Sequence, residues 1–392
     1  MKFRLNPHFS DSELKTLKQI TIVSTSLCAL VVCGFWGFHT VRTKIEEKNK
    51  AQSFPQYEER SLLPIDIESN ILCADNFLLS DNPQKAIPHL QRVIALQKND
   101  TETRLKLAKA YFESGYYTNA LEQYSFLDED QNYPDSIRSK VSAGKGICLF
   151  YLGKHEESMQ ILKDCLNRFP KAADAACFIG QIETSKEPPS DSALSYFEQA
   201  IRIDSSYVEP WYQLARFNML KENYPKAREL LLKALDLNPL HEKSHSRLGM
   251  IYYYMGNPEL AKKSYLTALA LNPRDFNTRY NLGELYYSVL ADTQNAFREF
   301  NEALKENPAH VDANFKAGLI CLQNNMIKEA IRYFKSALQS DQSNIRILFQ
   351  LAVAFERLGS KNEAIDIYRK ILTIDDLNTI AKEKVRLLSL QL

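Results

Sequence analysis

Small and apolar residues recur along this chain with a period of 34 residues. The period is clearest around two Asn-Pro pairs, at Pro239 and Pro273, which lie one period apart. Equivalent positions ahead of the first proline hold Trp211, Leu214, Ala215, Ala227, Leu231 and Ala234, and those ahead of the second hold His245, Leu248, Gly249, Ala261, Tyr265 and Ala268. A fixed period in this range indicates stacked supersecondary units instead of one closed globule.

The same pattern continues in both directions and predicts about nine units between Ile67 and Asn378. The predicted units span about 67–100, 101–138, 139–172, 173–207, 208–241, 242–275, 276–310, 311–344 and 345–378. The first, third and fourth units follow the pattern least closely, and the fourth and seventh each need one inserted residue.

Each unit is predicted to form two short antiparallel helices, because apolar residues at spacings of three and four mark one buried face per helix. Small residues at the eighth and twentieth positions allow close helix packing, and an aromatic residue at the twenty-fourth fills the space beside them. The fifteenth position holds Gly115, Gly153, Gly256, Asn325 and Gly359, which tolerate the left-handed backbone that ends a helix. A proline at the thirty-second position ends the second helix.

These positions together resemble the tetratricopeptide repeat (TPR) family over about four-fifths of the chain. The resemblance implies an all-α fold, a right-handed superhelix (α-solenoid) of about nine helix-turn-helix repeats. Proteins of this family usually act as scaffolds, adaptors or co-chaperones whose concave face binds a peptide or a partner domain. Residues 379–392 are predicted to form a capping helix that covers the last apolar face.

The run from Ile20 to Phe38 contains 19 residues and no charge. As a helix it would be about 28 Å long, close to the thickness of a bilayer core. We therefore predict a single transmembrane helix at 20–41, after a short basic tail at 1–19 and before a polar juxtamembrane spacer at 42–66. A cleaved signal peptide and a buried helix are the alternatives, but bulky residues stand where a cleavage site needs small ones.

Basic residues flank the run on both sides and leave its orientation open. The short basic leader slightly favours an N-terminus in the cytoplasm, whereas the odd number of cysteines in the repeats, at positions typical of packing, suits a reducing compartment for the repeats. The predicted localisation is therefore a membrane, crossed once.

Composition argues against several function classes. The 49 Lys and Arg residues against 48 Asp and Glu residues leave a net charge of +1, without a basic field for nucleic acid. The sequence has no phosphate-binding glycine loop, nucleophile elbow or CxxC pair. We expect a protein that is not an enzyme and that uses no cofactor and no small-molecule substrate.

One motif is typical of an enzyme. The segment His241-Glu242-Lys243-Ser244-His245 matches H-E-x-x-H, in which two histidines on one helical turn bind zinc and the glutamate activates water. However, His245 takes the packing position of Trp211 in the preceding unit, and His241 falls in the turn after Pro239. We expect structural roles for both histidines and no metal site.

The resemblance also implies that the second, fifth, ninth and twelfth positions of a repeat face the concave groove. Candidate partner-binding residues at these positions are Tyr212, Arg216, Tyr253, Tyr280, Tyr287, Phe315 and Phe349. Aromatic rings on a solvated face indicate a binding site for an apolar or aromatic peptide. The alternative is that the rings pack between neighbouring repeats.

Two classes of function follow. The first is a membrane-tethered scaffold or adaptor that binds a protein or peptide partner in its groove to organise a membrane or envelope complex. A narrower version is similar to the lipopolysaccharide-assembly adaptors, although their zinc module needs cysteine pairs that this sequence lacks. The second class is a zinc-dependent hydrolase that uses the H-E-x-x-H motif.

Overall fold

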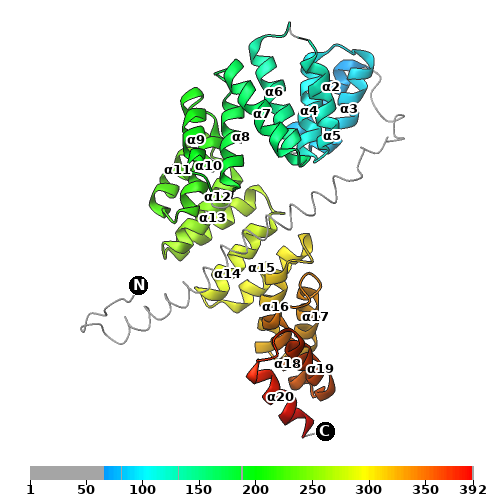
Figure 1. Ribbon diagram of the computed structural model, residues 1–392, viewed down its shortest axis with the longest axis vertical. Helices are drawn as coiled ribbons and strands as arrows, with labels where there is room; N and C mark the ends of the chain where they lie inside the picture. The colour runs from blue at the N-terminus through cyan, green and yellow to red at the C-terminus, as the bar shows by residue number, and fades with distance from the viewer. Residues whose placement is uncertain (1–65, 81, 131, 187–188, 391–392) are drawn as a thin grey trace, which may run out of the picture. The chain divides into compact units, whose positions relative to one another are not determined.

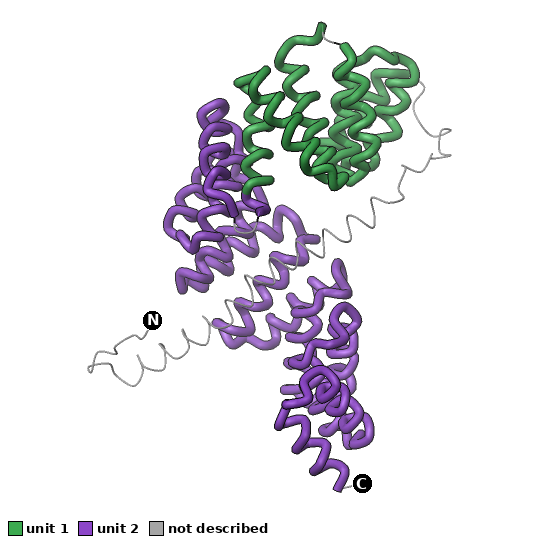
Figure 2. Tube along the Cα trace, viewed as in Figure 1, with its two compact units in different colours: residues 1–183 green, residues 184–392 purple. Residues whose placement is uncertain are grey.

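The computed structural model describes residues 66–80, 82–130, 132–186 and 189–390, and within these ranges the regular structure consists of helices without strands (Figure 1). The chain divides into two compact units, residues 1–183 and 184–392 (Figure 2). The division falls between Glu183 and Thr184, inside the fourth predicted repeat and at the end of α8 (Ala173–Thr184).

In the first unit, helices follow one another as antiparallel pairs. They are α2 (Ile67–Leu79), α3 (Pro83–Leu96), α4 (Thr101–Glu113), α5 (Tyr117–Asp128), α6 (Asp135–Tyr151), α7 (His155–Arg168) and α8 (Ala173–Thr184). Each of the first six packs mainly against its neighbours in the chain, as stacked repeats do.

The second unit continues the same alternation. Its helices are α9 (Ser192–Ile203), α10 (Val208–Leu220), α11 (Tyr224–Leu237), α12 (Glu242–Tyr254), α13 (Pro258–Leu271), α14 (Phe276–Ser288), α15 (Thr293–Glu306), α16 (Val311–Gln323), α17 (Ile327–Ala337), α18 (Ile345–Leu358), α19 (Lys361–Ile374) and α20 (Thr379–Ser389). The last helix packs on α19, so the helical part of the predicted cap is present.

The two helices of a pair approach closely where the eighth position is glycine. In three repeats the glycine lies against the aromatic ring of the twenty-fourth position, as Gly249 on Tyr265, Gly283 on Phe300 and Gly318 on Phe334. A Cβ atom at any of these glycines would lie 2.5 to 2.7 Å from the ring. All three rings are buried. The predicted pairing of a small residue with an aromatic one is therefore confirmed.

The turn between the two helices uses the left-handed backbone in seven of the pairs, from α4–α5 to α18–α19. The fifteenth-position residues Gly115, Gly153, Gly256, Asn325 and Gly359 all have positive φ, between 59° and 84°, which confirms the prediction. Glu222 and Ala291 occupy the equivalent turns of two other repeats and also have positive φ, 57° and 53°. The same turn is thus made without glycine, at a cost in backbone strain.

The predicted transmembrane segment lies outside the described residues. None of the helices within the described ranges is both long enough and apolar enough to cross a membrane. The anchor at 20–41 therefore stays a prediction.

Candidate partner-binding surface

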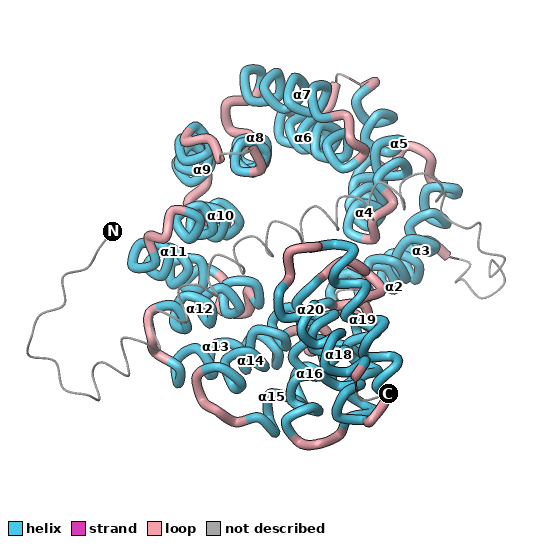
Figure 3. Tube along the Cα trace, turned by 60° about the horizontal axis from the view of Figure 1, so that its bottom comes forward, coloured by secondary structure: helices cyan, strands magenta, loops and turns pink. Residues whose placement is uncertain are grey.

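The candidate surface is formed by the first helices of successive pairs, α10, α12, α14, α16 and α18, which we call the first-helix row. Figure 3 shows α10, α12 and α14 on one side of their partners α11, α13 and α15. Each first helix begins at a turn that follows the second helix of the preceding pair. The row therefore presents equivalent positions of consecutive repeats one after another.

Side-chain contacts join neighbouring helices of the row at intervals of one repeat. They are Ser246 Oγ to Thr278 Oγ1 at 2.5 Å, Tyr253 OH to Ser288 Oγ at 3.1 Å, Lys316 Nζ to Glu284 Oε1 at 2.8 Å, and Arg346 Nη2 to Asp312 Oδ1 at 3.5 Å. The Lys316–Glu284 pair is largely shielded from solvent, since only 21% and 13% of the two side chains are exposed. These contacts hold the side chains of the row in fixed positions.

Three of the seven candidate residues are buried in the stack. Tyr212, Tyr280 and Phe315 are only 6%, 8% and 4% exposed. The Tyr212 ring packs edge-on against the ring of His241 at 5.3 Å, and the Tyr280 ring lies 4.8 Å from the ring of His310.

Phe315 is covered by residues from other elements. Its ring lies 5.9 Å from that of Phe334, and the guanidinium of Arg346 lies 4.2 Å above it. The expectation that Tyr212, Tyr280 and Phe315 face solvent is therefore wrong, because residues of neighbouring helices and turns cover them. For these three rings, packing inside the stack is the better interpretation, through contacts within a repeat and, for Phe315, also with the next one.

The other four candidates, Arg216, Tyr253, Tyr287 and Phe349, are partly exposed. Burial raises the pKa of the Tyr253 phenol, whose oxygen contacts Ser288. The Tyr287 ring carries Lys316 Nζ at 4.8 Å from its centre. Part of each side chain can therefore reach a partner, and their role in binding stays a prediction.

The fourth position of the first helix carries a recurrent hydrogen bond that sequence inspection missed. In four consecutive repeats a side-chain nitrogen donates to the backbone carbonyl six residues earlier: Trp211 to Ser205 at 3.1 Å, His245 to Pro239 at 2.9 Å, Arg279 to Pro273 at 3.0 Å, and Asn314 to Pro308 at 2.9 Å. Four unrelated residue types thus close the same turn. The shared property is one N–H donor at a fixed place in the repeat.

The first histidine of the H-E-x-x-H segment also has structural contacts. His241 precedes α12 as its N-cap residue, and its Nδ1 lies 2.7 Å from Ser244 Oγ. Burial lowers the pKa of its imidazole. Within the ranges that the structure describes, no three His, Cys, Asp or Glu side chains gather as a metal site.

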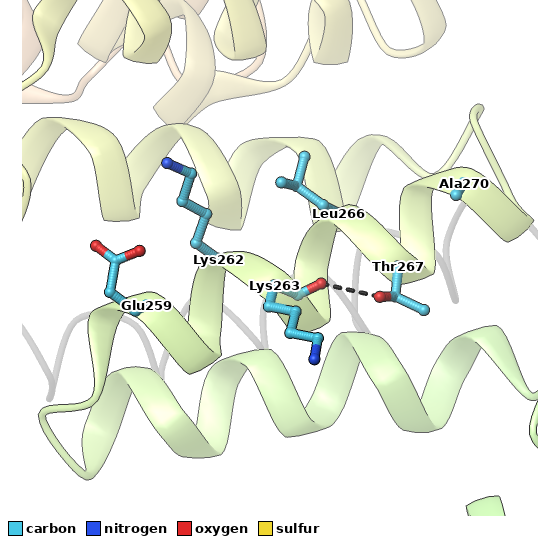
Figure 4. Close-up of a pocket in the computed structure, with 6 residues that line it drawn as sticks. All are labelled: Glu259, Lys262, Lys263, Leu266, Thr267 and Ala270. Atoms are coloured by element: carbon cyan, nitrogen blue, oxygen red, sulfur yellow. Dashed lines mark hydrogen bonds between the residues drawn. The ribbon is translucent and has the colours of Figure 1, made fainter.

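Two shallow hollows lie on the surface of the described residues. One, of about 470 Å³, is lined by Glu259, Lys262, Lys263, Leu266, Thr267 and Ala270, all from α13 (Figure 4). Thr267 Oγ1 donates to the Lys263 carbonyl at 3.0 Å along this face. Another is lined by residues 97–100 in the turn between α3 and α4. Neither includes a candidate residue, and neither has the convergent polar groups of a cofactor site.

Three family models, each described as a tetratricopeptide repeat, match the chain. They match residues 144–172, 190–242, 242–275, 289–345 and 327–378. Together these ranges cover just over half of the chain.

Individual relatives are distant. The peroxisomal targeting signal receptor of Saccharomyces cerevisiae is 24% identical over 296 residues, covering 71% of this chain and 46% of the receptor. Tetratricopeptide repeat protein 6 of Homo sapiens is 22% identical over 211 residues, covering 53% of this chain and 40% of the relative. The chain thus spans less than half the length of either relative.

The solved structure of the APC/C hetero-tetramer Cut9–Hcn1 is also similar. It is 18% identical to this chain with a TM-score of 0.58, and the match covers 82% of this chain and 63% of that chain. At this identity the similarity shows the fold alone.

Proposed function

Because the chain belongs to the tetratricopeptide repeat family, we propose that it is a protein-interaction scaffold whose first-helix row binds a protein or peptide partner. The observation that carries the proposal is the set of contacts that join successive helices of the row. Side chains that are already fixed lose little conformational freedom on binding, so more of the contact energy appears as affinity. The name of one relative, a peroxisomal targeting signal receptor, is consistent with a role in binding proteins.

The binding residues that we propose are the partly exposed members of the row, Arg216, Tyr253, Tyr287 and Phe349. Tyrosine and arginine are frequent anchors at interfaces because each combines a large contact area with polar groups. The buried rings of Tyr212, Tyr280 and Phe315 would form the packed layer beneath them. An apolar or aromatic partner would then contact ring edges and aliphatic surface between polar groups, instead of inserting among those three rings.

We assign no catalytic role to the H-E-x-x-H segment. The Nε2 atom of His245 donates to a backbone carbonyl, and Nδ1 of His241 is within hydrogen-bond distance of Ser244. These contacts account for both histidines without metal chemistry.

The finer part of the proposal is that the scaffold is tethered to a membrane through Ile20–Phe38. The support is the length and the uncharged sequence of this run. A change of Leu30 to Arg should cost about 2.5–3.5 kcal/mol of insertion free energy. The full chain should sediment with membranes and resist a carbonate wash, and the Leu30→Arg chain should do so less. Wild-type chain in the soluble fraction would refute the tether.

The binding surface can be tested with the double variant Tyr253→Ala/Tyr287→Ala. Partners would first be captured from detergent-solubilised membranes with the full chain and identified by mass spectrometry. The double variant should lower the affinity for the captured partner by about 2–4 kcal/mol, with little change in melting temperature.

A matched control changes two exposed leucines outside the row, Leu232→Ala/Leu266→Ala on α11 and α13. The control should bind the partner as the wild type does. Equal capture by the Tyr253→Ala/Tyr287→Ala variant would show that the partner binds elsewhere.

A further inference from the structure

Two basic side chains of α12 lack an acidic partner among the residues that the structure describes. Lys243 and Arg247 lie four residues apart, so they share one side of the helix. Lys243 is exposed and Arg247 is partly buried, and neither forms an ion pair with a described residue. Like charges at this spacing repel each other, so the pair slightly destabilises the helix that carries it.

Arg247 contacts the neighbouring first helix α10 and uses few of its donors. Its Nε donates to the hydroxyl of Tyr212 over 3.5 Å, and its Nη1 donates to the thioether sulfur of Met250 over 3.2 Å. The first contact is long, and a thioether is a weak acceptor. A guanidinium carries more N–H donors than these two contacts use. A partly buried cation with unused donors is stabilised when an anion binds it.

Equivalent cations in two other repeats are neutralised by an acid of the preceding repeat. The sixth residue of the second repeat, Lys106, binds Asp75, the ninth of the first, at 2.9 Å. The sixth residue of the eighth repeat, Lys316, binds Glu284, the ninth of the seventh, at 2.8 Å. Arg247 is the sixth residue of the sixth repeat, so the equivalent partner is the ninth residue of the fifth repeat. That residue is Arg216 and not an acid.

Arg216 and Arg247 contact one side chain from two different helices. Arg216 Nη1 donates to Gln213 Oε1 at 2.8 Å, and its guanidinium lies 6.0 Å from the centre of the Tyr212 ring. Arg247 contacts the hydroxyl of the same tyrosine. Positive charge is therefore concentrated at the place where the equivalent repeats carry an ion pair, and such a concentration attracts anions.

Acids at the starts of the adjoining first helices form no ion pair with α12 and are engaged in their own helices. Glu209 of α10 accepts a hydrogen bond from Gln213 Nε2 at 2.5 Å. Asp275, the N-cap of α14, accepts from the backbone N–H groups of Asn277 and Thr278 at 3.1 and 3.3 Å. The positive charge on α12 is therefore available to another molecule.

We propose that Arg216, Lys243 and Arg247 form a cationic site that binds a carboxylate of the partner, in an acidic side chain or at a free C-terminus. The planar guanidinium fork matches both oxygens of a carboxylate, and the lysine adds a flexible point charge. The site depends on the proposed function, because it supplies the charged part of recognition by the first-helix row. The partner is then an apolar or aromatic segment that carries a carboxylate.

The site is tested with three dansyl-labelled peptides of one length, titrated with the full chain in mild detergent and followed by fluorescence anisotropy. Tyr-Leu-Glu-Leu-Tyr with an amidated C-terminus carries a side-chain carboxylate only. Tyr-Leu-Gln-Leu-Tyr with a free C-terminus carries a terminal carboxylate only, and the same peptide with an amidated C-terminus carries none. At least one carboxylate peptide should bind the wild type about tenfold more tightly than the neutral peptide. The carboxylate peptide with the higher affinity identifies the source of the carboxylate.

The double variant Lys243→Gln/Arg247→Gln should abolish most of this difference in affinity, because it removes two of the three cations. Lys243→Gln alone should reduce the difference in part, and it keeps the fold because Lys243 is exposed. The matched control Lys233→Gln/Lys263→Gln removes the same charge from exposed positions on α11 and α13, and it should bind all three peptides as the wild type does. Circular dichroism melts of the variants check that each one is folded.

Absence of a preference for either carboxylate peptide, including absence of binding by all three, would overturn the proposal. An equal loss of the preference in the control, or its retention in the double variant of α12, would overturn it as well. The proposed function fails by a different result, which is retained capture of the partner by Tyr253→Ala/Tyr287→Ala. A failure of the carboxylate site alone therefore leaves the row as a binding surface for a neutral partner.

Discussion

The burial of Phe315 leads to a prediction that separates packing from partner binding. The change of Phe315 to Ala removes a ring that is only 4% exposed and that contacts Phe334 and Arg346. Phe→Ala changes in well-packed interiors cost about 3–5 kcal/mol, because a cavity remains. For a cooperative unit of the size of residues 184–392, each kcal/mol lowers the melting temperature by roughly 2–4 °C. We therefore expect the melting temperature of this unit to fall by about 6–20 °C.

Thermal unfolding of the full chain, followed by far-ultraviolet circular dichroism, measures this effect. Phe349→Ala is the matched control, since Phe349 has the same place in the next repeat but is partly exposed. We expect a smaller decrease for the control. If Phe315→Ala melts like the wild type and yet loses the captured partner, Phe315 is a solvent-facing anchor and the packing interpretation is wrong.

Three further changes test the turns, the close helix contacts and the partly buried His310. Glu222→Gly should raise the free energy of unfolding by up to about 1 kcal/mol in urea titrations, because φ at this position is 57° and glycine relieves the strain; a decrease would contradict this account. Gly318→Ala should lower the same free energy by about 1–3 kcal/mol, because the added Cβ would lie 2.6 Å from the Phe334 ring. An unchanged urea midpoint would mean that the ring moves freely. Burial lowers the pKa of His310, so the unfolded chain binds a proton first and stability falls as the pH drops below about 6.5 towards the folded pKa. His310→Asn keeps an N-cap acceptor, as Asn344 does in the next repeat, and should flatten this part of the stability–pH curve; an equally steep curve would exclude His310 as its source.

The repeat period predicts the helix contacts well because both partners of each contact belong to one unit. Gly318 and Phe334 lie at fixed positions of the same repeat, so their spacing alone implies that they touch. The turns were predicted less completely. A left-handed residue can be predicted at Gly359, because glycine adopts this backbone easily. It could not be predicted at Glu222 and Ala291, which adopt the same backbone only because the helices on either side require it.

Exposure on the first-helix row could not be predicted from one repeat at a time. Tyr280 is at a position that the family directs towards its groove, yet His310 at the end of the same repeat covers its ring. Tyr212 and His241 are related in the same way. The covering residue differs between repeats: histidines that cap the next helix cover Tyr212 and Tyr280, whereas Arg346, the second residue of α18, lies over Phe315. A candidate at the fifth position must therefore be judged together with the start of the next helix.

The H-E-x-x-H segment shows that a short motif should be interpreted within the register of the repeat. Its second histidine is at the position where Arg279 and Asn314 also donate to a carbonyl six residues earlier. These side chains share an N–H donor, so this position of the repeat requires a hydrogen bond and does not require an imidazole. His245 is one of several donors that fix the turn before a first helix, and this role explains the histidine without a zinc site. The side chains that remain able to contact another molecule are the partly exposed ones of the first-helix row.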